Sequence, residues 1–181
     1  MTKRYSNYDW ILKGFDVLKR QGPSSLTIDT LCQTANKTRG SFYFHFESMD
    51  AYFEGLANNW LEEFTTPIIA TTPTTHGRLD LLNLLAIRLD LELESGVRRL
   101  SEKQDIIRPI VHKADHLRIE WLAQLYAAAG TYSQDQAKDL AEIEYAAFVG
   151  FRLINPDLTA SRSRELYDAF LSFTERNNHP R

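Results

Sequence analysis

Apolar residues recur at three- and four-residue intervals along the chain, and this spacing restricts the protein to helices. Ile11, Phe15 and Leu18 follow it and lie on one face of a helix expected from about Asn7 to Gln21. Gly22-Pro23 should end that helix, because glycine accepts a left-handed cap and proline cannot continue the helical hydrogen bonds. No alternating run of β-branched residues occurs, so we predict an all-α fold.

The rest of the chain divides into further helices. Two short ones are expected next, the first capped by Ser25 or Thr27 and the second starting near Thr38, and Ser48 should cap a fourth. The segment Thr65–Thr75 is rich in threonine and proline and is predicted to be a loop. Longer helices are predicted over 77–94, ended by a break at Gly96, and over 105–129, 133–154 and 161–177.

The composition is that of an ordinary globular protein, with 181 residues, 43% hydrophobic and 25% charged. The single cysteine, Cys32, excludes an intrachain disulfide and a four-cysteine zinc site. The most apolar stretch, 79–93, is interrupted by charged residues, so no transmembrane helix is expected. Met1–Tyr8 does not resemble a secretory signal. We therefore expect a cytoplasmic protein without a membrane partner.

Charge is unevenly distributed between the two parts of the chain. The formal net charge is -3. The first 50 residues contain seven basic and five acidic side chains, and the remaining residues contain 14 and 19. A mildly basic head on an acidic body permits a DNA-binding module at the N-terminus, although a difference this small also occurs in many enzymes.

The joint between the two short helices is the three-residue segment Ala35-Asn36-Lys37. A helix-turn-helix unit needs a tight turn here, with a residue that accepts a positive φ. Asn36 is the best non-glycine candidate for that conformation. The segment therefore favours a helix-turn-helix motif.

The helix after this turn has an unusual sequence, Thr-Arg-Gly-Ser followed by Phe-Tyr-Phe-His-Phe. Its start is small, polar and cationic, which suits a helix that presents its N-terminal end to a DNA groove. Gly40 costs about 1 kcal/mol relative to alanine in a helix, and a close approach of the backbone to DNA would explain it. Phe42, Phe44 and Phe46 are expected to pack inside the protein rather than to contact DNA.

The run from Leu31 to Phe53 closely resembles the DNA-binding signature of tetracycline-repressor (TetR) family regulators. In that signature a tight turn precedes serine or threonine, lysine or arginine, glycine, and an aromatic run ending in His-Phe, which here is His45-Phe46. The detailed resemblance covers Tyr8 to Leu61. It implies a three-helix DNA-binding head over residues 1–48 and a helical effector-binding and dimerisation domain over 49–181.

The resemblance implies a repressor that a small-molecule effector releases from a palindromic operator in double-stranded DNA. Three positions depart from the family pattern. Asn36 and Lys37 replace the usual Gly-Val of the turn, where Lys37 adds a charge, and Met49 replaces a lysine that would contact phosphate. No DNA role is assigned to Met49. The implied DNA-binding residues are Thr27, Lys37, Thr38, Arg39, Gly40, Ser41, Tyr43 and His45.

The resemblance also implies an apolar effector pocket and a homodimer. Arg88 lies among leucines. It is either a cation at the edge of the apolar stripe that these leucines form or a buried polar group for an anionic ligand. The candidate pocket residues are Trp60, Phe64, Arg88, Trp121, Tyr126 and Phe148. The last two helices should pair with their copies as a four-helix bundle. The candidate interface residues are Leu140, Ala147, Phe151, Leu166, Phe170 and Phe173.

Two alternative functions remain open from the sequence. His112 and His116 are four residues apart on one helix face, which is compatible with a metal-dependent hydrolase, but only scattered residues such as His76 and Glu120 could complete a site. A helical module that no longer binds DNA is supported only by Lys37 and Met49. We expect no catalytic residues, no metal and no cofactor.

Overall fold

The protein is helical throughout the part of the chain that the structure describes. A computed structural model describes residues 5–71, 90–128, 130–155 and 157–176. Every regular element in these ranges is an α-helix or a short 3-10 helix, and none is a strand. The predicted all-α fold is confirmed. None of the described helices is both long and apolar enough to cross a membrane.

The N-terminal head is a three-helix unit. Helix α1 spans Asn7–Gln21, as predicted, and Ser6 and Asp9 form a capping box at its start. Gly22 ends it with a φ of 79°. A 3-10 turn and two short helices follow, and their bounds are Pro23–Ser25 (η1), Ile28–Ala35 (α2) and Arg39–His45 (α3).

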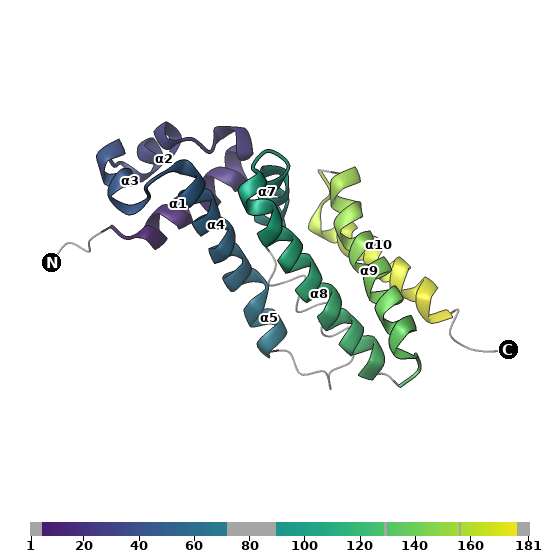
Figure 1. Ribbon diagram of the computed structural model, residues 1–181. Coiled ribbons are helices and arrows are strands. Elements are labelled where there is room, and N and C mark those ends of the chain that lie inside the picture. Colours follow the sequence, from purple (N-terminus) through teal and green to yellow (C-terminus); the bar gives the residue numbers. More distant parts are fainter. Residues whose placement is uncertain (1–4, 72–89, 129, 156, 177–181) are drawn as a thin grey trace.

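The body is a layer of longer helices beside the head (Figure 1). Helices α8 and α9 lie side by side, and α10 packs on α9 at the end of the molecule opposite the head. The bounds of the body helices are Met49–Phe64 (α4), Thr66–Thr71 (α5), Leu91–Ser101 (α7), Asp105–Ile107 (η2), Arg108–Ala128 (α8), Gln134–Ile154 (α9) and Ala160–Arg176 (α10).

Two predictions about this region were wrong. The expected loop Thr65–Thr75 contains helix α5, whose Ile69 packs against the hydrophobic cluster between α8 and α9. Gly96 does not break a helix but lies inside α7. A Cβ atom there would lie 3.2 Å from Leu18 Cβ, so glycine allows α7 to approach α1 closely. Residues 77–89 of the predicted helix 77–94 lie outside the described residues.

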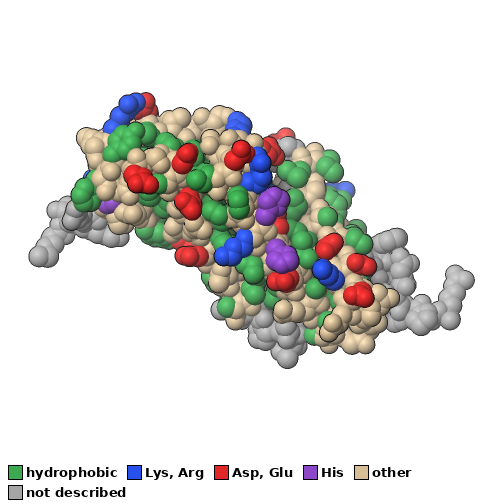
Figure 2. Space-filling model, in the orientation of Figure 1, with side chains coloured by type: hydrophobic (Ala, Val, Ile, Leu, Met, Phe, Trp, Pro, Cys, Tyr) green, Lys and Arg blue, Asp and Glu red, His purple; other side chains and the backbone are tan. Residues whose placement is uncertain are grey.

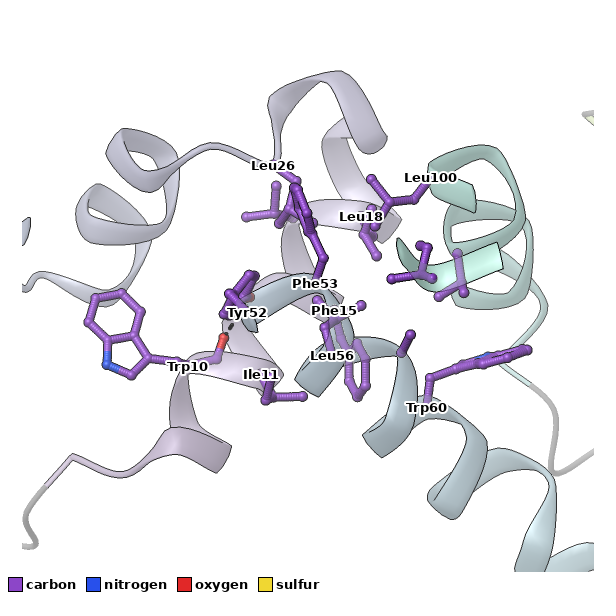
Figure 3. Close-up of a cluster of buried hydrophobic side chains, with 14 of the residues drawn as sticks. Trp10, Ile11, Phe15, Leu18, Leu26, Tyr52, Phe53, Leu56, Trp60 and Leu100 are labelled. Atoms are coloured by element: carbon purple, nitrogen blue, oxygen red, sulfur yellow. Dashed lines mark hydrogen bonds between the residues drawn. The ribbon is translucent and has the colours of Figure 1, made fainter. Parts of the chain in front are cut away.

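One hydrophobic cluster joins the head to the body (Figure 3). Helix α1 contributes residues such as Trp10, Phe15 and Leu18, and the body contributes side chains of α4, α7 and the start of α8. The members labelled in Figure 3 are Trp10, Ile11, Phe15, Leu18, Leu26, Tyr52, Phe53, Leu56, Trp60 and Leu100. The head thus shares its core with the body, and the division after residue 48 stays a prediction.

A second cluster lies between α8 and α9. Its buried members are Trp121, Leu122, Leu125 and Tyr126 of α8, with Ala137, Ala141 and Tyr145 of α9. Tyr167 and Phe170 of α10 pack against it. The far half of the body therefore has its own core.

Helix α1 meets α4 at Gly14. A Cβ atom on Gly14 would lie 2.0 Å from the Tyr52 hydroxyl oxygen and 2.5 Å from Leu56 Cδ1. The Tyr52 hydroxyl donates a buried hydrogen bond of 3.0 Å to the Trp10 carbonyl. Burial raises the pKa of this hydroxyl. Only glycine at position 14 allows this approach of the two helices.

The Gly14→Ala substitution should lower the free energy of unfolding by about 1–3 kcal/mol, because its methyl group overlaps the Tyr52 side chain. Urea denaturation measures the change. Gly55→Ala is the matched control, since its Cβ atom would lie 3.7 Å from Phe46 and 3.8 Å from Ile11, which is ordinary contact. Adding Tyr52→Phe to Gly14→Ala should recover part of the loss. Equal stabilities of the Gly14→Ala and Gly55→Ala variants would show that the close approach carries no constraint.

Candidate nucleic-acid interface

A left-handed turn links α2 to α3. Asn36 has φ 50° and ψ 51°, the conformation predicted for it. Its amide donates to the carbonyl of Gln33 at 3.2 Å, and the amide of Lys37 donates to that of Cys32 at 2.9 Å. These bonds satisfy the last carbonyls of α2 and end that helix, and α3 starts at Arg39, two residues after Lys37. The structure thus contains the predicted helix-turn-helix joint.

Helix α3 has one buried face and one exposed face. Phe42 is fully buried, and its ring lies 5.4 Å from the rings of Trp10 and Tyr52. Phe46 is also buried and packs on the same side. The opposite face, which we call the outer face of α3, consists of Arg39, Gly40, Tyr43 and Phe44, all exposed.

The packing role predicted for Phe44 is wrong, although it is correct for Phe42 and Phe46. The side chain of Phe44 is 68% exposed. Residues two positions apart in a helix point in nearly opposite directions, so three aromatics at spacings of two cannot share one face. This geometry was the available signal that Phe44 belongs to the outer face.

The predicted hydroxyl contacts lie at helix starts. Thr27 Oγ1 accepts from the amide of Thr30 at 3.2 Å and caps α2. Thr38 Oγ1 accepts from the amide of Ser41 at 3.1 Å and caps α3. Both threonines are exposed, and Ser41 is half-buried. Each cap places a hydroxyl beside backbone amides, the arrangement in which a helix start meets an anion.

Lys37 lies in the turn between α2 and α3, and His45 lies at the end of α3. The ammonium of exposed Lys37 lies 5.2 Å from the centre of the Tyr5 ring. His45 is half-buried, and its Nδ1 lies 2.6 Å from Asn7 Oδ1, so it ties the end of α3 to the start of α1. Met49, which also departs from the family pattern, packs against the first hydrophobic cluster.

Arg39 forms a two-pronged ion pair with Asp29 across the motif. Its Nε donates to Oδ1 at 2.8 Å and its Nη2 donates to Oδ2 at 2.6 Å. The side chains remain 65% and 70% exposed. The hydrogen bond with Asp29 raises the pKa of Arg39. Sequence reasoning missed this partner, which lies ten residues earlier in the first turn of α2.

The surface of the head is not strongly basic. Figure 2 shows acidic and basic side chains interspersed over the visible face, with several acidic ones on the part formed by the head. This mixture agrees with the small positive balance of the first 50 residues. The charge of the head therefore provides no broad basic surface on the visible face.

A buried polar network holds the body helices together near the predicted pocket. The Arg118 guanidinium donates to Glu94 Oε1 at 2.9 Å and to Thr65 Oγ1 at 2.8 Å. It also lies 5.1 Å from the centre of the Trp60 ring. Burial opposes the charge of Arg118, but the Glu94 carboxylate and the Tyr145 hydroxyl together outweigh it and the pKa of Arg118 is raised. This arginine, in the middle of α8, was missed by sequence reasoning.

Arg98 extends the network to α9. Its guanidinium donates to Asp115 Oδ1 at 2.5 Å and to the Tyr145 hydroxyl at 2.7 Å. Burial opposes the charge of Arg98, but the hydrogen bond with Asp115 and the charge of Glu94 outweigh it and raise its pKa. Burial also raises the pKa of Tyr145. Glu94 and Arg98, four residues apart on α7, were the sequence signal for this network.

The predicted pocket residues are divided between the two cores. Trp60 belongs to the first cluster, while Trp121, Tyr126 and the half-buried Phe148 belong to the second. Phe64 lies beside Phe15 and lines an open hollow of about 450 Å³ between α1, α4 and α7. Arg88 lies outside the described residues. The effector pocket stays a prediction.

Helix α9 has a second apolar face directed away from α8. Ile143 is 56% exposed and Ile154 is 78% exposed. Ala147 and Phe151, which lie between them at helical spacing, are half-buried. Of the other predicted interface residues, Leu140 and Phe170 pack against the second cluster, Leu166 is half-buried, and the side chain of Phe173 lies outside the described residues.

The two histidines of the hydrolase alternative are both exposed on α8. His116 Nε2 lies 3.2 Å from Glu120 Oε1. Within the described ranges, no group of three or more histidine, cysteine, aspartate or glutamate side chains is placed to hold a metal ion. His76 lies outside these ranges.

The arrangement of a helix-turn-helix head on a helical body is the fold that the resemblance to TetR regulators predicted. E. coli NemR in its reduced form shares it with a TM-score of 0.75 and 17% identity, over 94% of this chain and 96% of NemR. EbrR, a multidrug binding protein solved with imidazole, has a TM-score of 0.63 and 17% identity, over 92% of this chain and 95% of EbrR. A protein of Pseudomonas aeruginosa PAO1 described as a transcriptional regulator has a TM-score of 0.65 and 17% identity, over 94% of this chain and 90% of that protein. No family model and no curated protein matches the chain by sequence.

The Gly40→Ala substitution should separate folding from DNA binding. The nearest atom to a Cβ on Gly40 is Thr38 Oγ1 at 3.7 Å, so an added methyl group has space within the protein. The free energy of unfolding should stay equal or rise by up to about 1 kcal/mol. DNA affinity should fall by about 1–3 kcal/mol if the backbone of α3 packs against DNA. Thermal unfolding and fluorescence anisotropy measure the two quantities, and unchanged DNA affinity would contradict the close approach.

Proposed function

We propose that this chain is a homodimeric, ligand-responsive regulator that binds a palindromic operator in double-stranded DNA and acts in the cytoplasm. The observation that carries the proposal is the outer face of α3. Arg39, Gly40, Tyr43 and Phe44 project from a short helix that is anchored to the head by Phe42 and Phe46. An exposed face of this composition, on the second helix of a helix-turn-helix motif, suits the major groove.

The outer face offers the groups that a groove requires. Arg39 can donate to guanine, Tyr43 can donate to phosphate, and the ring of Phe44 can contact a thymine methyl group. Gly40 lets the backbone of α3 approach the DNA. The flanking starts of α2 and α3, capped by Thr27 and Thr38, supply amides and hydroxyls for the phosphates on either side.

The outer apolar face of α9 supports the homodimer. A stripe on this face runs from Ile143 through Ala147 and Phe151 to Ile154, and its two end residues are exposed in one protomer while the two between them are half-buried. Pairing of this stripe with its copy across a two-fold axis would bury it. Two heads related by that axis would contact half-sites about 34–36 Å apart, one turn of DNA.

The shared core supports control of the head by an effector in the body. Lys19 of α1 forms an ion pair of 2.6 Å with Asp90 at the start of α7. Lys103 donates to Ser24 Oγ at 2.7 Å, and α1 touches α7 at Gly96. An effector that shifts α4 or α7 would therefore move α1 and change the spacing of the heads. Effector and operator then lower each other's affinity by the same factor.

Selection of bound fragments from random-sequence DNA tests the proposal. Purified dimer at physiological salt should enrich one palindrome. Arg39→Ala should lower affinity for that palindrome by about 1–3 kcal/mol, because the variant lacks the arginine contact with DNA. Arg108→Ala is the matched control: Arg108 is also exposed and paired with a nearby carboxylate, Asp105, but lies away from α3. No enrichment by folded dimer would favour the module without DNA binding instead.

The Ile143→Glu substitution should break the homodimer, since it places a charge on the apolar stripe of each α9. Sedimentation should then give a species near the chain mass of 20.9 kDa instead of twice that mass. Ile106→Glu is the control, because Ile106 is an exposed isoleucine in η2. A dimer that survives Ile143→Glu would show that this stripe is not the interface.

A further inference from the structure

The ion pair between Arg39 and Asp29 occupies a defined part of the arginine side chain. A guanidinium group carries five N–H donors, and four of them form two edges of two parallel donors each. Asp29 takes the donor on Nε and one donor on Nη2, which form the side edge. The end edge, with donors on Nη1 and Nη2, is left facing away from the carboxylate. Arg39 therefore keeps one complete two-donor edge.

The remaining edge suits guanine. The O6 and N7 atoms of guanine accept two parallel hydrogen bonds in the major groove, and the end edge of arginine supplies two parallel donors. A long side chain that is 65% exposed would otherwise sample many rotamers. Two hydrogen bonds to Asp29 restrict the guanidinium plane as well as its position. Asp29 is itself held by the first turn of α2, which Thr27 caps.

We propose that Asp29 is a positioning residue for base recognition: it holds the Arg39 guanidinium so that its end edge faces a guanine of the operator. This inference rests on the proposed DNA binding. It adds a specificity-determining residue that itself carries a charge of the wrong sign for DNA. Asp29 acts through Arg39 and needs no contact with the nucleic acid.

A purely structural role for Asp29 has different consequences. An acidic residue in the first turn of a helix stabilises that helix through the helix dipole. Such a residue near DNA also repels phosphates, whatever the sequence. Removing it would then change affinity for all DNA sequences by one factor. A positioning role changes the preference at the single base pair that Arg39 recognises.

The test compares base preference, position by position, between variants. The probe is the palindrome that the wild type selects, together with its single-base variants, measured by competition at fixed salt. Arg39→Ala first identifies the position at which guanine preference depends on Arg39. Asp29→Asn should then lower guanine preference at that position by about two- to fivefold, the scale of an exposed ion pair, and leave other positions unchanged.

Asp50→Asn provides the matched charge control. Asp50 is also exposed in the first turn of a helix, α4, which follows the motif in sequence, whereas the carboxylate that pairs with Arg39 is that of Asp29. It should raise affinity for all sequences equally and alter no base preference. In the Arg39→Ala background, Asp29→Asn should have no effect on preference. Asp29→Glu keeps the charge and should give a smaller loss of guanine preference at the same position. This second variant keeps the test decisive if Asp29→Asn does not fold.

Three results would overturn the inference. One is an Asp29→Asn profile that matches that of Asp50→Asn. Another is a rise in guanine preference, because Asp29 would then compete with the base for Arg39. The third is an Arg39→Ala variant that loses preference at no position. A wild type that selects no sequence overturns the proposed function together with this inference, whereas the three results above overturn the inference alone.

Discussion

Helix α1 lies against both α4 and α7, and the head depends on these two contacts for its position. Gly14 admits the Tyr52 ring at a distance that no other residue allows, and the Tyr52 hydroxyl is bonded to the carbonyl of Trp10. On the other side, Gly96 of α7 lies against Leu18. Because the interior is close-packed, α1 cannot move without α4 and α7. The head is thus mechanically part of the body, which is the condition for the proposed control of DNA binding by an effector.

The polar network in the body adds a second constraint to this arrangement. Two arginines, Arg98 and Arg118, face two carboxylates, Glu94 and Asp115, so their formal charges balance. Such a network contributes little net stability, because desolvation offsets the Coulombic attraction. It does fix the relative positions of α7 and α8, since an axial slip would leave a buried charge without its partner, and the Tyr145 hydroxyl connects α9 to the same network. Motion of α7 toward or away from α1 is therefore tied to the interior of the body.

Local signals in the sequence were sufficient for most helix ends, but contacts distant in sequence were not predictable. Serine and threonine caps and the positive φ of Asn36 depend on neighbouring residues alone, and the structure confirms them. Gly96 was misjudged because its role depends on Leu18, far away in sequence. The packing predicted for Phe44 failed because the aromatic run was treated as one group instead of two faces. Arg118 was overlooked because its carboxylate partner lies on another helix.

The small charge of the head explains why geometry around α3 matters. Nonspecific affinity grows with the number of phosphates that lysines and arginines neutralise. A head with seven basic and five acidic side chains in its first 50 residues gains little from this source. Under the proposed function, discrimination between DNA sequences would depend on a few well-placed groups, and a freely rotating Arg39 would contribute poorly. An acidic partner that lowers general attraction to DNA while restricting the one arginine on the outer face of α3 is consistent with that requirement.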